Sequence, residues 1–384
     1  MKIGIDNISP GLSTGKQTLG GMLHFLQDLA TQLPAHGRAH EFKLFSPTWS
    51  DPLDAPLAPN LKIVACPNVP RARWRRVLCE QLSLPEQIRQ EKIDVWLGTS
   101  NVLPQRLKTR SVLLVQSLQY FTHPQAYPLS QLLYLRAFVP RSLRKASAVI
   151  TWSLASKAEV TRRFGIAPDK VTVVHHAVPR ALERLDIIDA DTDRQQVAQV
   201  VGDKPYILCV SSFYPYKNLF RLIEAFARLK PEYPHKLMFI GTETRGLKKD
   251  ALFAYAERLG VRHDVLCLGR VPHDEIAKFY RHAALMAMPS LDETFGFPVL
   301  EAMALGCPVV TSNVSSMPEI TGEAAVLVNP YDVQSIADGM RRLLSDPNLR
   351  HSLAQIGCKR ARRFTQERMA KQILHVLEAA GKDD

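Results

Sequence analysis

Two glutamates, Glu293 and Glu301, stand eight residues apart on either side of a Phe-Gly pair. The apolar run Leu285–Met288 before them predicts a strand, and the sequence after Gly296 predicts a helix with Pro298 at its first position. The free amides and the dipole of a helix start attract anions. This stretch is therefore suited to bind a diphosphate, with Glu301 in the first helical turn beside it. Two ordinary surface acids fit the same spacing equally well.

Lys217 follows another apolar run, Tyr206–Val210, which predicts a strand. Asn218 suits the N-cap of the next helix, so Lys217 stands in a strand-to-helix loop. This loop begins with Ser211 and Ser212. Ligands of doubly wound sheets bind where the strands end, and an ammonium group there neutralises phosphate. An ordinary surface lysine is the alternative interpretation of Lys217 alone.

A glycine pair, Gly20 and Gly21, precedes an apolar stripe at helical spacing over Met22–Leu33. Glycine lets a substrate approach the backbone closely, although the pair is weak evidence by itself. The preceding stretch, Gly11–Lys16, is not a Walker A loop, because three residues instead of four separate its glycines and Gln17 replaces Ser or Thr.

Short apolar runs alternate with helical patterns in both halves of the 384-residue chain. The runs are Ile3–Ile5, Val112–Val115, Ala148–Ile150, Val171–Val174, Tyr206–Val210, Leu237–Ile240, Val265–Leu268, Leu285–Met288 and Val309–Thr311. Alternating strands and helices predict an α/β class with parallel sheets covered on both faces. The length favours two domains, and the polar stretch 179–203 predicts the connection between them.

Nearly all of the net charge of +12 falls in the first half, since residues 1–178 hold 22 Lys and Arg against 11 Asp and Glu. Such asymmetry indicates an anionic partner. The basic residues that could meet such a partner are Arg71, Arg73, Arg75 and Arg76 around Trp74, supported by Arg136, Arg141, Arg144 and Lys145. An indole among arginines suits lipid headgroups, which predicts docking on an anionic membrane surface. A solvated face, or steering of a negatively charged donor, accounts for the same residues.

Three further features predict the compartment. No run of about 18 apolar residues predicts a membrane-spanning helix. Asp6 interrupts the N-terminus before an apolar signal segment forms, and the six cysteines are scattered without a C-x-x-C pair. We therefore expect a cytoplasmic protein that is peripheral on the inner face of the membrane.

Taken together, these motifs resemble those of the retaining glycosyltransferase family 4, which has the GT-B fold. The match covers most of the chain and is strongest from Tyr206 to Phe364. It rests on Tyr206-Ile-Leu-Cys-Val-Ser-Ser with Lys217-Asn218, Leu268-Gly-Arg-Val-Pro, Pro289-Ser-Leu-Asp-Glu-Thr-Phe-Gly and Glu301-Ala-Met-Ala-Leu-Gly-Cys-Pro-Val-Val-Thr. The resemblance implies two Rossmann-like domains whose parallel sheets face each other across a cleft. Residues 1–178 would form the acceptor-side domain, 204–365 the nucleotide-sugar domain, and 366–384 a helix that crosses back.

The resemblance also implies roles for individual residues. Glu301 would bind the ribose and Glu293 the transferred sugar, while Lys217 would hold the diphosphate together with the amides around Thr294, Phe295 and Gly296. Lys217 and Glu293 would be the catalytic pair. Val271 would meet the base through its backbone, and Gly21 would line the cleft from the other domain.

The implied reaction moves a hexose-type sugar from a UDP- or GDP-sugar to a glycan or a lipid-linked acceptor, in cell-envelope or exopolysaccharide synthesis. Family members retain the anomeric configuration, usually without a metal ion, so neither a metal nor another cofactor is expected.

The chain departs from the family pattern at three places. Ser211 stands where many members have Arg, so Lys217 would carry more of the phosphate charge. Gln116 stands where many members have His, and His123 follows seven residues later, so either of them is a candidate for the acceptor side. His176 and Ala177 replace a common Asn-Gly.

Other classes of protein are less well supported by the sequence. Asp189-Ala190-Asp191 matches the metal-binding D-x-D motif by letter, but it lies in a polar stretch and does not end a strand. Adjacent His175 and His176 do not have zinc-ligand spacing. A non-catalytic nucleotide-sugar binding protein is a further alternative, which the presence of Glu293, Glu301 and Lys217 disfavours. No stacking motif supports a nucleic-acid partner.

Overall fold

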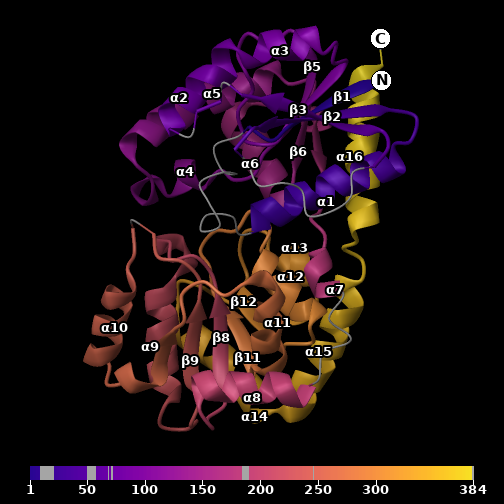
Figure 1. Cartoon of the computed structure of the whole chain (residues 1–384). Helices are drawn as coiled ribbons and strands as arrows, with labels where there is room; N and C mark the ends of the chain where they lie inside the picture. The colour runs from indigo at the N-terminus through magenta and orange to yellow at the C-terminus, as the bar shows by residue number, and fades with distance from the viewer. Residues whose placement is uncertain are drawn as a thin grey trace. The chain divides into compact units, whose positions relative to one another are not determined.

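The computed structural model describes residues 1–8, 21–49, 58–67, 69–70, 72–183, 190–244 and 246–382, which form two compact units (Figure 1). Unit 1 comprises Met1–Phe121, Leu129–Ala177 and Thr365–Asp384. Unit 2 comprises Thr122–Pro128 and Val178–Phe364. The short segment Thr122–Pro128 therefore packs with unit 2, although the chain on both sides of it belongs to unit 1.

Unit 1 is built on a seven-stranded parallel sheet in the order β3-β2-β1-β4-β5-β6-β7. The strands are β1 (Lys2–Asp6), β2 (Glu41–Pro47), β3 (Leu61–Cys66), β4 (Val95–Gly98), β5 (Arg110–Leu114), β6 (Ala148–Thr151) and β7 (Val171–Val173). The inner strands are almost entirely buried, as expected for a parallel sheet with both faces covered.

Helices cover this sheet. They are α1 (Gly21–His36), α2 (Arg73–Leu82), α3 (Leu84–Gln90), α4 (Gln119–Thr122), α5 (Leu129–Lys145), α6 (Leu154–Phe164) and the C-terminal α16 (Gln366–Gly381). The last of these packs on α1, β4 and β5, because Met369, Ile373 and Leu377 place one buried face at four-residue spacing. Gln366 Nε2 also donates to Asp28 Oδ2 at 2.8 Å.

Unit 2 contains a six-stranded parallel sheet in the order β10-β9-β8-β11-β12-β13. The strands are β8 (Tyr206–Val210), β9 (Lys236–Ile240), β10 (Val265–Cys267), β11 (Leu285–Met288), β12 (Val309–Ser312) and β13 (Ala325–Val328). The helices are α7 (Arg180–Glu183), α8 (Ala190–Val201), α9 (Leu219–Leu229), α10 (Lys249–Arg258), α11 (His273–His282), α12 (Phe297–Ala304), α13 (Met317–Thr321), α14 (Val333–Ser345) and α15 (Pro347–Ala361). The predicted α/β class with two parallel sheets is thus confirmed.

The stretch that the sequence assigns to a connection contains helical structure. Arg180–Glu183 and Ala190–Val201 are helices of unit 2, and α8 packs on α11. Asp193, Val197 and Val201 recur every four residues and are buried, so they form the inner face of α8. Arg281 Nη1 lies 3.5 Å from Asp193 Oδ2, which pairs the buried carboxylate.

The strand order of unit 2 determines where a ligand meets the sheet. From β8 the chain builds outward to β9 and β10, and it then returns to add β11, β12 and β13 on the other side. The loops after β8 and β11 therefore diverge from neighbouring strand ends. Such a switch point is where doubly wound sheets bind ligands.

Candidate functional site

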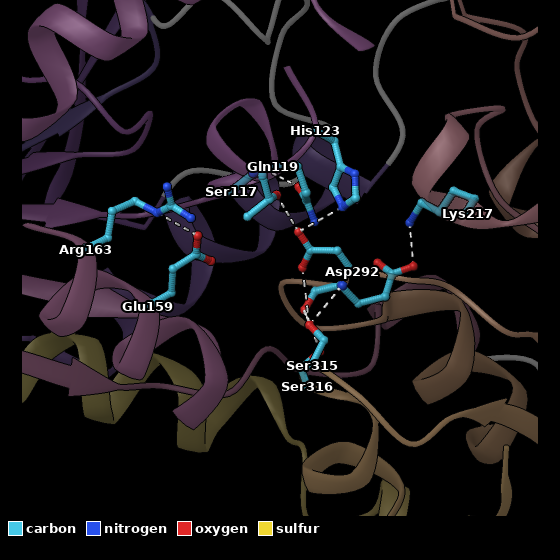
Figure 2. Close-up of polar contacts among 11 residues, drawn as sticks. Ser117, Gln119, His123, Glu159, Arg163, Lys217, Asp292, Ser315 and Ser316 are labelled. Carbon is cyan, nitrogen blue, oxygen red and sulfur yellow. Dashed lines mark hydrogen bonds and ion pairs between the residues drawn. The ribbon is translucent and has the colours of Figure 1, made fainter. Parts of the chain in front are cut away.

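A buried ion pair joins the two loops at the switch point of unit 2. Lys217 Nζ, from the loop after β8, lies 2.6 Å from Glu293 Oε1, from the loop after β11. The side chains are only 14% and 7% exposed. Figure 2 shows the ammonium group of Lys217 directed at this carboxylate. The structure therefore brings together two residues that are 76 positions apart in the sequence.

Asn218 holds the two loops in register, although not as a helix cap. It precedes α9 in the left-handed region, with φ of 63°, and its side chain makes no capping hydrogen bond. Its Nδ2 instead donates to the carbonyls of Pro289 at 2.9 Å and Pro330 at 2.6 Å. The expected side-chain N-cap is therefore wrong, because the amide ties the loop after β8 to those after β11 and β13.

The backbone around Glu293 is anchored by two serines after β12. The amide of Glu293 donates to Ser315 Oγ at 3.0 Å, and Ser316 Oγ donates to the carbonyls of Glu293 at 2.9 Å and Phe295 at 3.0 Å. Ser315 Oγ also lies 3.3 Å from Asp292 Oδ1. These contacts hold the backbone of Glu293 in place, and neither serine was indicated by the sequence.

The start of α12 depends on a glycine. Gly296 has a φ of 99°, a conformation that L side chains rarely adopt, and a Cβ there would lie 2.2 Å from Met317 Cε. Pro298 is the second residue of α12, where its missing N–H removes no helical hydrogen bond. The first amides of α12 thus point toward the same strand ends as the ion pair, as an anion site requires.

Glu301 is the fifth residue of α12 and lies in the second turn, so its expected place in the first turn is wrong. The side chain is buried, and Tyr280 Oη donates to Glu301 Oε2 at 2.9 Å. Burial raises the pKa of Glu301 to about 7, although the hydrogen bond from Tyr280 opposes the rise. This carboxyl group therefore changes its charge near neutral pH.

Segment Thr122–Pro128 contacts Asp292, which precedes Glu293 in the sequence. Thr122 Oγ1 donates to Asp292 Oδ2 at 2.8 Å, and His123 Nε2 lies 3.7 Å from the same oxygen, as Figure 2 shows for His123. The His123 ring packs against that of Tyr216, with centroids 5.2 Å apart. Burial lowers the pKa of His123 and Asp292 opposes this, so the imidazole is largely neutral at neutral pH.

The remaining donor-side candidates lie along the same sheet edge. Ser211 is buried at the end of β8, and Ser212 Oγ lies 3.1 Å from Thr242 Oγ1 after β9. Val271 is half-buried in the loop after β10, two strands from β8. Phe295 is buried beside Gly296, and Thr294 is half-buried. Gly21 is the first residue of α1 in unit 1.

Gln116 forms part of a network inside unit 1. Its Nε2 donates to the carbonyl of Thr99 at 3.0 Å, and its Oε1 accepts from Trp152 Nε1 at 3.1 Å. The Trp152 ring stacks on His176, with centroids 3.6 Å apart, and burial lowers the pKa of His176 well below its usual value. The Gln116 amide is thus bonded at both ends, which the sequence did not indicate.

The predicted membrane-surface cluster lies only partly within the described residues. Arg71 and the side chains of Arg73 and Trp74 lie outside the described residues, and Arg75 is exposed. Arg76, however, is 1% exposed, and its guanidinium lies 5.1 Å from the centre of the Trp49 ring. Its expected contact with a membrane is wrong, because its position on α2 turns it into the domain.

Two other sequence expectations concern metals and membranes. Asp189 lies outside the described residues, and Asp191 is in the first turn of α8. Within the ranges that the structure describes, no three His, Cys, Asp or Glu side chains gather closely enough to hold a metal ion. No helix in those ranges is long and apolar enough to cross a membrane.

Comparison with known proteins now identifies the family. Residues 19–182 match the model of "Glycosyltransferase Family 4", and residues 190–360 match that of "Glycosyl transferases group 1". The chain is 30% identical over 298 residues to the O-antigen chain mannosyltransferase B of Escherichia coli, covering 76% of each protein. The chain belongs to glycosyltransferase family 4. The resemblance inferred from its motifs is thereby confirmed.

Solved structures support the GT-B fold of this family 4 chain. Sucrose-phosphate synthase from Thermosynechococcus elongatus has a TM-score of 0.78 at 20% identity, covering 98% of both chains. Anabaena HepE, solved in complex with UDP and glucose, has a TM-score of 0.72 at 21% identity, covering 99% of this chain and 100% of the other.

Proposed function

We propose that this family 4 glycosyltransferase moves a hexose from a UDP- or GDP-sugar to a glycan or lipid-linked acceptor, with retention at the anomeric carbon and without a metal ion. The observation that carries the proposal is the buried pair of Lys217 and Glu293 at the switch point of unit 2. A charged pair that joins two ligand-edge loops is unusual as a structural device, because burying charges costs more than burying apolar groups of the same size.

Lys217 supplies the positive charge for a leaving diphosphate. In the structure its ammonium group is neutralised by Glu293 at 2.6 Å. A donor whose phosphates lie against the start of α12 would give Lys217 a second anionic partner and would leave Glu293 free to contact the sugar. Negative charge grows on the leaving group in the transition state, so a fixed ammonium group lowers the barrier.

The role of Glu301 follows from its burial and its pKa. A carboxylate inside unit 2 accepts hydrogen bonds from paired hydroxyls, such as those of a ribose. Tyr280 already donates to Oε2, which orients the carboxyl group before a ligand arrives. Since burial raises the pKa of Glu301 to about 7, the ionised form that ribose requires is favoured above neutral pH.

Similar proteins support the choice of donor and acceptor classes. One relative bears the name O-antigen chain mannosyltransferase, and one structure of the same fold contains UDP and glucose. We infer a hexose donor, and mannose and glucose are the first to test. An acceptor in cell-envelope or exopolysaccharide synthesis, reached from the cytoplasmic side, fits the same relatives.

A donor panel tests the proposal. Thermal shift with UDP- and GDP-sugars of glucose and mannose should identify one donor that stabilises the protein, and NMR of the product should show an unchanged anomeric configuration. Stabilisation by a donor without any sugar release, in the presence of acceptor extracts, would instead indicate a non-catalytic binding protein. No stabilisation by any nucleotide sugar would reject the donor site.

A further inference from the structure

Two helices of unit 1 expose large apolar side chains to solvent. Leu78 and Leu82 on α2 are 50% and 53% exposed, and Leu129 and Leu133 on α5 are 70% and 64% exposed. Single exposed leucines are common, but four on two helices of one unit form a feature that water disfavours. We call these four residues the leucine surface.

On α5 the exposed leucines share a face with arginines. Leu129, Leu133, Arg136 and Arg144 recur at intervals of four, three and eight residues, which places them within one side of a helix. A neighbouring side, with Leu132, Leu135 and Val139, is buried in unit 1. Helix α5 therefore has two apolar faces, and only one of them packs on the domain.

Helix α2 repeats this arrangement. Its exposed Arg75, Leu78 and Leu82 have the three- and four-residue spacing of a single helix face. The loop before β5 links the two helices, because the amide of Gln105 donates to Gln81 Oε1 of α2 at 2.8 Å and Gln105 Nε2 donates to Ser142 Oγ of α5 at 3.2 Å. Figure 1 shows both helices on the same side of unit 1.

The exposed charges on helices α2 and α5 are of one sign. Arg75, Arg106, Arg136, Arg141 and Arg144 are exposed. Helix α5 contains no acidic residue, and the only acid of α2, Glu80, is 6% exposed. A face that binds a protein partner usually mixes both signs of charge with hydrogen-bonding groups, whereas a bilayer with anionic headgroups offers hydrocarbon beneath a negative layer.

We propose that the leucine surface and its arginines dock unit 1 on an anionic lipid bilayer. The leucines enter the region beneath the headgroups, and the arginines contact phosphates while their aliphatic stems follow the leucines inward. This inference extends the proposed function, since it would bring the enzyme to a lipid-linked acceptor. It keeps the predicted Arg75, Arg136 and Arg144, leaves out the buried Arg76, and adds the four exposed leucines.

Vesicle co-sedimentation of the full chain tests the proposal. Binding to phosphatidylcholine vesicles that contain about 30 mol % phosphatidylglycerol should be strong at low salt and weak at about 1 M salt, where the Debye length is roughly 3 Å. Leu78→Ser, Leu82→Ser, Leu129→Ser and Leu133→Ser together should weaken binding by more than roughly tenfold, because bound apolar area is lost. Arg75→Gln, Arg136→Gln and Arg144→Gln should each weaken it by roughly fivefold.

Matched controls lie on unit 2. Leu327→Ser and Ile356→Ser remove leucine and isoleucine side chains that are 37% and 39% exposed, and Arg342→Gln, Lys359→Gln and Arg362→Gln remove equal charge. These variants should bind vesicles like the wild type. Thermal melting and donor hydrolysis in water should stay unchanged in every variant. Donor hydrolysis therefore reports failure of the donor site, and vesicle binding reports failure of membrane docking.

Three results would overturn docking. Wild-type protein that ignores anionic vesicles at low salt would reject it. Equal binding by the four-leucine variant and the unit 2 control would show that general charge, not this surface, attracts lipid. A wild-type dimer that becomes monomeric in the four-leucine variant by light scattering would show that a second copy covers the surface.

Discussion

The loops after β8 and β11 in unit 2 meet through a buried charge pair, Lys217 with Glu293, whereas those after β5, β6 and β7 in unit 1 meet through neutral groups. In unit 1 an amide, an indole and an imidazole satisfy one another, through Gln116, Trp152 and His176. Both arrangements lie at the carboxyl ends of parallel strands. The same architecture is therefore filled with charge in one unit and with neutral rings in the other.

This difference indicates which unit stabilises the charges that arise in the reaction. Paired charges cost free energy to bury, and at a ligand edge that cost is offset when a ligand or transition state uses them. A stacked indole and a neutral imidazole bury ring area and satisfy hydrogen bonds without that cost. We interpret the strand ends of unit 2 as the place where the reaction is catalysed. We interpret the network of unit 1 as structural support, around which surface residues can vary with the acceptor.

The largest effect is expected from Lys217→Ala. Loss of the ammonium group removes stabilisation of the leaving diphosphate, so turnover should fall by about 10²- to 10³-fold. Glu293 would also lose its partner while buried, so some loss of thermal stability is expected alongside. Steady-state kinetics at saturating donor, with circular dichroism to verify folding, measure both.

A second lysine variant separates the loss of catalysis from the loss of an ion pair. Lys230→Ala removes a pair with Asp264 at 2.9 Å, also in unit 2 but outside the switch-point loops. It should leave turnover near the wild-type value. Near wild-type turnover in folded Lys217→Ala, or an equal loss in Lys230→Ala, would break the distinction between the two edges.

A smaller effect is expected from pH through Glu301. With the pKa of Glu301 raised to about 7, donor affinity should be roughly tenfold weaker at pH 6 than at pH 8. Tyr280→Phe removes the hydrogen bond that opposes this rise, so the midpoint should move to higher pH. Calorimetric titration of the nucleotide between pH 5.5 and 8.5 measures this, in steps of about half a pH unit.

Folding stability should show the opposite dependence on pH. Unfolding exposes Glu301, whose pKa then returns to an ordinary value near 4.5, so the folded state holds an extra proton between about pH 4.5 and 7. This contribution to stability is present at low pH and is lost as the pH rises through 7. Glu301→Gln should remove both dependences, and a Gln variant that keeps them would assign the titration to another group.

Gln116→Ala tests the role of the neutral network in unit 1. It would leave Trp152 Nε1 and the Thr99 carbonyl without their partner, which costs about 1–3 kcal/mol in unfolding free energy. Denaturant unfolding should register this cost, while nucleotide affinity should remain within about twofold. A loss of nucleotide affinity well beyond about twofold would contradict a structural role for the unit 1 network.

The smallest effect is expected from Thr122→Val. The change removes a hydrogen bond to Asp292 at 2.8 Å while keeping the shape of the side chain. Because Asp292 precedes Glu293, turnover should fall a few-fold at unchanged nucleotide affinity, as about 1 kcal/mol of positioning implies. Thr321→Val, whose hydroxyl bonds only the Met317 carbonyl 2.8 Å away within α13, is the control.

The sequence predicted the charged residues at the strand ends of unit 2 better than the residues that hold them in place. Lys217 and Glu293 were singled out because charge that follows an apolar strand suits a ligand edge, and the resemblance to the family gave them their roles, since ordinary surface residues fit the local pattern as well. Asp292, Tyr280 and Ser315 were missed, since their importance comes from contacts with residues far away in the chain. The second-turn position of Glu301 was missed because α12 begins at Phe297, one residue ahead of the proline taken as its start.

The same contrast holds for the fold. Strands with continuous apolar runs, such as Leu285–Met288, were predicted, whereas β2 was not. In β2 a buried Lys43 interrupts the apolar pattern, and only the structure shows its Nζ paired 2.6 Å from Glu91 Oε2. Helix α8 was taken for a connection because its two aspartates and its polar neighbours hide the spacing of Val197 and Val201.

In the proposed function, protein groups led by Lys217 and the amides of α12 provide the charge that a metal ion provides elsewhere. The most direct test is sugar release by the wild type from its preferred donor, with and without excess EDTA. The account predicts equal rates, because no step depends on a bound cation. Full loss of activity in EDTA, restored by Mg²⁺ or Mn²⁺, would contradict it.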